Sequence, residues 1–278
     1  MAARFEPYVQ LVDVTDEAAL IAWRGFRLGE HDGRWRAERA GETFGARSEP
    51  RGRAAVEVVD GDGTTVARTV TDETNHAWVE GLRPATTYRY RVLVDGEPWG
   101  AGERFDWVPG SLGAARRPLD QRLRTHAPGS DPDPVTFLAI GDFGVGIASG
   151  ADGERQLAVA RTMQRLADAV DVRFVVGLGN SIYHGPGGRQ DATGAFDEDW
   201  WLTFFQPYRY LFDHLAFYPT AGNQRQLGYR GQRRSGAVGG QPLPPHPVRT
   251  AGGGGAGVDR LRPVLPPAGR RAAGVGVR

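Results

Sequence analysis

The stretch VTFLAIGDFG, residues 135–144, decides the fold of the second half of this chain. Its first six residues form a continuous apolar run, which is typical of a strand buried on both faces of a parallel sheet. The run ends in Gly141-Asp142, so the strand delivers a polar side chain to its carboxyl end. Open α/β sheets bind ligands at that end. The stretch therefore predicts an α/β domain with a candidate site at Asp142.

Further helices and strands follow this first strand. Apolar residues at helical spacing or in short continuous runs predict a helix over 154–170, a strand over 173–178, a helix over 197–214 and a strand over 216–220. Together with the first strand they give the order β-α-β-α-β. The sequence thus predicts an α/β domain over 135–224 that is begun but not finished.

Each of the three predicted strands is followed by a glycine and then a polar residue. The polar residues are Asp142, Asn180 and Asn223. Because the carboxyl ends of parallel strands lie at one edge of a sheet, we expect these side chains to lie together. A carboxylate and two amide oxygens suit a hard or borderline cation. Each residue alone is an ordinary turn former, so the predicted metal site depends on their recurrence.

Residues 1–108 carry a different pattern, in which short apolar runs alternate with period two. Asp60-Gly61-Asp62-Gly63 and Asp95-Gly96 are predicted hairpin turns, because glycine tolerates the positive φ that such turns require. This half is therefore expected to be an all-β sandwich. Residues 109–134, rich in Pro and Arg, are expected to be a linker, which makes the fold class multidomain.

The segment GLRPATTYRYRV at 81–92 resembles the fibronectin type III signature, in which a Leu packs under a turn and a Tyr hydroxyl caps the corner. In that resemblance Trp23 is the core tryptophan. A generic sandwich without this ancestry is the alternative. In either case we assign no chemistry to residues 1–108.

The composition excludes several functions. The chain has no Cys, which rules out disulfides, thiolate metal ligands and a thiol nucleophile. All 34 basic residues are Arg, so a lysine Schiff base, a P-loop lysine and the strand lysine of a kinase are impossible. No apolar run is long enough for a membrane span, and the first ten residues lack a signal-peptide pattern. We expect a cytoplasmic protein without a membrane partner.

The pattern stops at Arg225. Residues 225–278 contain 13 Gly, ten Arg and seven Pro but a single acid, Asp259. Such a composition cannot bury enough apolar surface to offset chain ordering, so we expect a disordered tail. A nucleic-acid-binding tail would gain from aromatic side chains that stack on bases, and the tail contains only Tyr229. Nucleic acid is therefore not an expected partner.

The coding sequence offers an explanation of this tail. An Arg-only chain rich in Gly and Pro suggests a GC-rich gene, whose wrong reading frames also encode Arg, Gly, Pro and Ala. One surplus base in codon 224 permits His at that position. Codons 225–235 read from their second bases then permit DSSDTEDSDDR. We expect that a frameshift near codon 224 has replaced the C-terminal part of the domain.

Three segments of the predicted α/β domain resemble motifs of the calcineurin-like metallophosphoesterases, and within that family of the purple acid phosphatase branch. The motifs of that branch are Gly-Asp-x-Gly, Gly-Asp-x-x-Tyr and Gly-Asn-His-Glu/Asp, often after a fibronectin-like domain, and histidine motifs follow them. The segment 141–144 matches the first motif in full. The segment 179–183 matches the second except at Asn180, and 222–224 matches two thirds of the third.

The resemblance implies a role for each matching residue. Asp142 and Tyr183 would bind metal 1, and Asn223 would bind metal 2. Asn180 stands where the family has the carboxylate that bridges both metals, and Gln224 stands where it has the catalytic histidine, so no catalytic residue is assigned. The later histidine motifs have no counterpart.

The departures from the family pattern predict a site with low affinity for metal ions. A neutral amide offsets the repulsion between two cations far less than a carboxylate does. The implied cofactors, two metal ions of the Fe, Zn or Mn class, are expected to be weakly held or absent. We expect a metallophosphoesterase-like hydrolase of phosphoric esters, with a phosphate ester as substrate, that is impaired or inactive. The alternative is a non-catalytic binding protein with a fibronectin-like module and a vestigial phosphoesterase domain.

Overall fold

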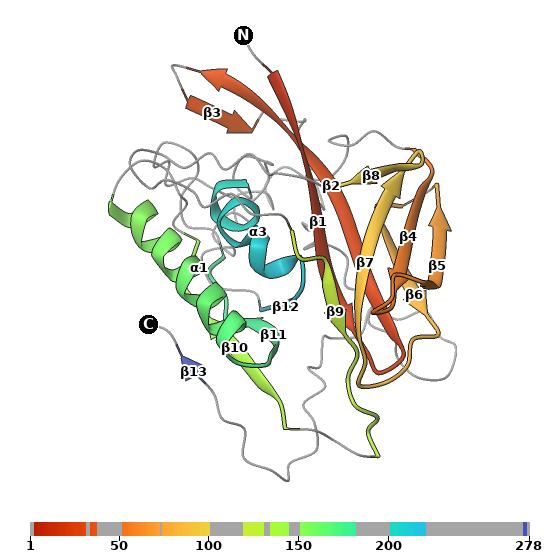
Figure 1. Cartoon of the computed structure of the whole chain (residues 1–278). Coiled ribbons are helices and arrows are strands. Elements are labelled where there is room, and N and C mark those ends of the chain that lie inside the picture. Colours follow the sequence, from red (N-terminus) through yellow and green to blue (C-terminus); the bar gives the residue numbers. More distant parts are fainter. Residues whose placement is uncertain are drawn as a thin grey trace, which may run out of the picture.

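The computed structural model describes residues 3–31, 34–37, 52–72, 74–100, 119–130, 134–144, 151–181, 201–220 and 275–276. Within these residues the chain is mostly β-sheet with few helices (Figure 1). Two of the sheets are antiparallel and come from the N-terminal half, and a third is parallel and comes from the second half.

The antiparallel strands follow the period-two segments of the sequence. The first sheet is built around β2 (Ala18–His31). This strand pairs with β1 (Ala3–Val14), β3 (Arg34–Ala37) and β6 (His76–Glu80). The second sheet has the order β5 (Thr65–Thr71), β4 (Ala54–Val59), β7 (Thr87–Val94) and β8 (Glu97–Trp99), with β9 (Arg122–Arg124) also paired to β7. Both predicted hairpin turns are confirmed: Gly63 has φ 85° between β4 and β5, and Gly96 has φ 88° between β7 and β8.

The two antiparallel sheets share one hydrophobic core. Side chains alternate along β7, where Tyr90 and Val92 are buried and Arg89 and Arg91 are exposed, as the period of a strand requires. Trp23 lies in this core, as the sequence predicted. The alternation therefore identifies the buried face of β7 correctly.

The turn before β7 is closed by a tyrosine. Leu82 is buried in the core, and the Tyr88 hydroxyl accepts a hydrogen bond of 2.9 Å from the backbone N–H of Arg83. The turn also holds Ala85 in the left-handed region at φ 52°. This is the arrangement of leucine and tyrosine that the 81–92 segment predicted.

Part of the predicted linker belongs to a sheet. Of residues 109–134 the structure describes 119–130 and Pro134, and β9 within them pairs with β7. Leu123 of β9 is buried in the core of the sandwich. Three residues with one apolar side chain give too little alternation to predict a strand from the sequence.

The parallel sheet confirms the three predicted strands. Its order is β12 (Ala216–Pro219), β11 (Val172–Gly177), β10 (Thr136–Ile140) and β13 (Val275–Gly276). β13 lies in the predicted tail and pairs beside β10. The rest of the predicted tail lies outside the described residues.

Helices join these strands along the chain (Figure 1). α1 (Ala151–Ala169) joins β10 to β11, and a π-helical turn η2 (Trp201–Phe205) runs into α3 (Gln206–Phe212) before β12. Of the apolar residues at helical spacing in the predicted helix 154–170, Leu157, Ala160 and Met163 are buried, whereas Val170 is 45% exposed just after α1. The helical period therefore holds until the last predicted position.

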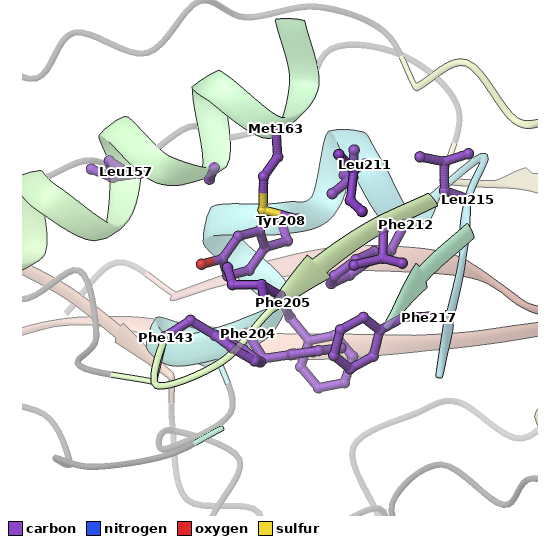
Figure 2. Packing of buried hydrophobic residues seen from close by; sticks show 14 of the residues in the cluster. Phe143, Leu157, Met163, Phe204, Phe205, Tyr208, Leu211, Phe212, Leu215 and Phe217 are labelled. Carbon is purple, nitrogen blue, oxygen red and sulfur yellow. The ribbon is translucent and has the colours of Figure 1, made fainter. Parts of the chain in front are cut away.

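An aromatic core fills the space between the parallel sheet and its helices. Figure 2 shows Phe143, Phe204, Phe205, Tyr208, Phe212 and Phe217 gathered there. Tyr8 of β1 and Phe26 of β2 join this cluster, and the ring of Tyr8 lies 4.7 Å from that of Phe205 between centroids. The first antiparallel sheet thus contributes to two cores, one on each of its faces.

Polar contacts also cross this junction. The Tyr218 hydroxyl of β12 donates to Oδ1 of Asp13 at 2.6 Å, and the Arg173 guanidinium of β11 donates to the carbonyl of Thr125 at 2.8 Å. β1 lies against β12. The sandwich and the parallel sheet are therefore packed together through buried side chains and hydrogen bonds.

Candidate metal-binding edge of the parallel sheet

The candidate site begins where β10 and β11 end. The strands are parallel and adjacent, so both carboxyl ends lie at one edge. The hydrogen-bond ladder continues past the strands: the N–H of Leu178 donates to the carbonyl of Ile140 at 2.8 Å, and the N–H of Asp142 donates to the carbonyl of Gly179 at 3.3 Å. The two loops therefore leave the sheet while still bonded to each other.

Both polar residues of this edge have left-handed backbone conformations. Asp142 has φ 53° and Asn180 has φ 52°, and Gly179 between the strand and Asn180 has φ 106°. Asn and Asp are the non-glycine residues most often found in this region, because their short side chains hydrogen-bond locally. The backbone alone thus accounts for part of the residue choice at these positions.

The two side chains meet directly. Nδ2 of Asn180 donates to Oδ1 of Asp142 at 2.7 Å. Asp142 is exposed and Asn180 half-buried, so the pair lies at the surface of the edge. The sequence-based expectation that these two residues lie together agrees with this contact.

Phe143 anchors the loop that carries Asp142. It is buried, and its ring lies edge-on to Tyr208 at 5.5 Å and to Phe217 at 6.0 Å between centroids. The preceding residue, Gly141, has little room for a side chain, because a Cβ there would lie 3.2 Å from Cβ of Leu178. The position of Asp142 is therefore fixed from both sides by neighbouring residues.

The third strand leads to the same edge. β12 pairs in parallel with β11, and the N–H of Thr220, just after β12, donates to the carbonyl of Gly177 at 2.8 Å. Asn223 and Gln224 follow shortly after. They lie outside the described residues, as does Tyr183, so the predicted places of Asn223 and Tyr183 at the edge stay predictions.

The residues that the structure describes do not fit a two-metal centre. They contain no group of three or more His, Cys, Asp or Glu side chains placed to hold a metal. At the edge itself, Oδ1 of Asp142 accepts an N–H from Asn180. We therefore derive no chemical step through a metal ion here.

A second polar cluster, which the sequence did not indicate, lies at the junction with the sandwich. Oδ1 of Asp213 lies 2.6 Å from Nδ1 of His214, and Oδ2 accepts the backbone N–H of Asp120 at 2.5 Å. The Tyr90 hydroxyl donates to the Asp213 carbonyl. Asp213 is 1% exposed and His214 7%, so a substrate cannot reach the pair. Its role is to satisfy buried polar groups between the two halves.

Comparisons with known proteins leave the family unassigned. No family model matches the chain, and no curated protein matches it. Among solved structures, PhoD is 14% identical with a TM-score of 0.40, over 77% of this chain and 38% of the PhoD chain. The fibronectin domain of human collagen α-1(XX) is 18% identical with a TM-score of 0.24, over 46% of this chain and 84% of that domain. A β-glucuronidase of Ruminococcus gnavus is 11% identical with a TM-score of 0.22, over 78% of this chain and 28% of the enzyme.

These overlaps are too loose to carry a functional argument. The chain spans less than half of the length of the PhoD chain that it overlaps. In the part of the chain that the structure describes, no helix is both long and apolar enough to cross a membrane.

Proposed function

We propose that this chain is a metallophosphoesterase-like protein of the purple acid phosphatase branch, a hydrolase of phosphoric esters by descent, and that it is impaired or inactive as it stands. The observation that carries the proposal is the edge of the parallel sheet. Two adjacent strands there lead into Gly141-Asp142 and Gly179-Asn180, at the places of the first two family motifs, and the two side chains touch. The GDFG motif at 141–144 matches the family in full.

In this proposal the chain has two domains and a tail. Residues 1–108 form a fibronectin III-like sandwich, supported by the Tyr88 hydroxyl that closes the turn after Leu82 and by the buried Trp23. Residues 135–224 form the first part of a metallophosphoesterase domain, supported by the parallel order of β10, β11 and β12. Residues 225–278 are the out-of-frame tail.

The proposed substrate class is a phosphate ester. In such enzymes two metal ions hold the phosphate oxygens and activate a water molecule. Asp142, Asn180, Tyr183 and Asn223 are the residues whose family counterparts hold the metals. Because the described residues do not fit the metal pair, the ability to hydrolyse the ester is proposed for the frame-restored protein and not for this chain.

The alternative function is a binding protein without catalysis. It is favoured by the hydrogen bond from Asn180 to Asp142, which satisfies the carboxylate without a cation. The two proposed functions differ in what the protein from a frame-restored gene would do. Only a metallophosphoesterase would regain metal and turnover together.

The test compares this chain with the frame-restored gene that also carries Asn180→Asp. Both proteins are purified, checked for folding by circular dichroism, and assayed for metal content and for hydrolysis of a chromogenic phosphate ester. We expect the restored protein to bind two metal ions per chain and to hydrolyse the ester, and this chain to do neither. A folded, restored protein without metal and without hydrolysis would overturn the proposal.

A further inference from the structure

The hydrogen bond between Asn180 and Asp142 is the last of three consecutive links between β10 and β11. The first two are backbone bonds, from Leu178 to Ile140 and from Asp142 to Gly179. The third joins side chains of residues that both have left-handed backbones. We call the last two of these links the strand-end clamp, formed by Asp142, Gly179 and Asn180.

The chemistry of Asp142 and Asn180 determines which side chain donates the hydrogen bond in the third link. An ionised carboxylate can only accept hydrogen bonds, and an amide offers either an N–H donor or an oxygen acceptor. At 2.7 Å the two groups attract only if the amide presents its N–H to Oδ1 of Asp142. The amide oxygen of Asn180 therefore points away from the position that a cation shared with Asp142 would need.

From this arrangement we infer that the amide of Asn180 takes the place of a cation at this edge, and that the strand-end clamp holds the ends of β10 and β11 together without metal. The inference extends the proposed function in one respect: the edge is the one where the family places its metals. Asn and Asp are nearly identical in shape, so one substitution changes the charge of the clamp with little change in packing.

With Asp at position 180, two carboxylate oxygens would meet at the distance that the hydrogen bond now spans. They repel each other unless a counter-charge lies between them. We expect Asn180→Asp to make the fold depend on a divalent cation that the present chain does not need. The exchange of both residues, Asp142→Asn with Asn180→Asp, restores one carboxylate and one amide and should remove that dependence.

The experiment measures thermal unfolding of the full chain and of the two variants, each with chelator and with MnCl₂. We expect the melting temperature of the present chain to be the same in both conditions. Asn180→Asp should melt lower in chelator by about 4 °C or more, and MnCl₂ should recover most of the loss. The exchanged double variant should melt close to the present chain and ignore MnCl₂.

Several outcomes would overturn the inference. One is an equal rise in melting temperature with MnCl₂ for the present chain and for Asn180→Asp. Another is an Asn180→Asp variant that melts like the present chain in chelator. A third is a double variant that is as unstable as the single variant. If Asn180→Asp does not fold in either condition, a double variant that folds normally still supports the clamp, and one that fails as well contradicts it. None of these results depends on hydrolysis by the restored gene, so the clamp and the proposed function can fail separately.

Discussion

Phe143 connects the candidate site to the core of the parallel half. Its ring packs against Tyr208 and Phe217, while its neighbour Asp142 lies at the surface. We expect Phe143→Ala to lower the free energy of unfolding by about 3 to 5 kcal/mol, because it leaves a cavity among aromatic rings. Urea denaturation measures this change. Phe143→Leu is the matched control and should cost clearly less, and equal losses for the two variants would contradict the packing argument.

Asn180 is the position at which the segment 179–183 departs from the Gly-Asp-x-x-Tyr motif that it otherwise resembles. We expect Asn180→Asp alone to give no metal-dependent hydrolysis of a chromogenic phosphate ester. The substitution supplies one carboxylate, but the sequence has no counterpart of the later histidine motifs that supply imidazole ligands, and a catalytic metal usually needs three protein ligands plus water. Robust hydrolysis by this single variant would mean that residues outside the described part, such as His184 or His246, complete the site.

At the scale of elements, Gly177 decides how closely β11 and β12 pack. A Cβ at this position would lie 2.6 Å from Cζ of Phe217 and 3.3 Å from Cα of Pro219. Phe217 is itself held by other buried rings, so it cannot move freely. We expect Gly177→Ala to cost about 1 to 3 kcal/mol, more than the gain of about 0.4 to 1 kcal/mol from a less flexible unfolded chain.

Equilibrium unfolding in urea checks this prediction. Gly61→Ala is the control, since a Cβ there meets nothing within 4 Å. Its effect should stay within about 0.5 kcal/mol. A Gly177→Ala variant as stable as the control would show that the two strands have room that the structure does not indicate.

The elements of the fold differ in how much the sequence predicts of them. β10, β11, β12 and α1 were predicted because continuous apolar runs and helical spacing are long enough to be distinguished from loops. The hairpin turns were predicted because their Asp-Gly pairs place a glycine where positive φ is needed, and Gly63 and Gly96 have that conformation. β9 was not predicted, because only Leu123 among its three residues is apolar. Alternation also could not indicate that Tyr8 and Phe26 pack against the parallel half, since it identifies a buried face but not its neighbour.

The candidate site was predictable in position but not in detail. Strand order and the Gly-Asp and Gly-Asn endings were sufficient to bring Asp142 and Asn180 to one edge. The direction of the amide depends on the close approach of the two side chains, which no sequence pattern encodes. The buried pair of Asp213 and His214 was missed because it follows a helix end, where polar residues are usually solvated.

At the scale of the whole molecule, buried tyrosines lie at the junction between the sandwich and the parallel half and in the adjoining aromatic core. Burial raises the pKa of Tyr8, Tyr90, Tyr208 and Tyr218, and the negative charge of Asp213 adds to the effect at Tyr8 and Tyr90, as that of Asp13 does at Tyr218. In the unfolded chain a tyrosine titrates near pH 10. Because the folded pKa is the higher one, the stabilisation is complete below about pH 10 and is lost as the pH rises above it.

We therefore expect the free energy of unfolding to be unaffected by these tyrosines up to about pH 10 and then to fall by up to about 1.4 kcal/mol per pH unit for each of them. Urea unfolding at several alkaline pH values measures the slope, and phenolate absorbance reports ionisation. Tyr218→Phe should reduce the slope. Complete titration of all tyrosines near pH 10 in a chain that stays folded would contradict the buried junction.

We propose above that the strand ends at Asp142 and Asn180 derive from a metallophosphoesterase-like domain and that the amide of Asn180, which donates to Asp142, takes the place of metal there. The most direct test is the metal content of the purified chain after equilibrium dialysis against manganese, zinc and iron salts, measured by mass spectrometry. The account predicts no stoichiometric metal in the present chain. One or two tightly held metal ions per chain would contradict it.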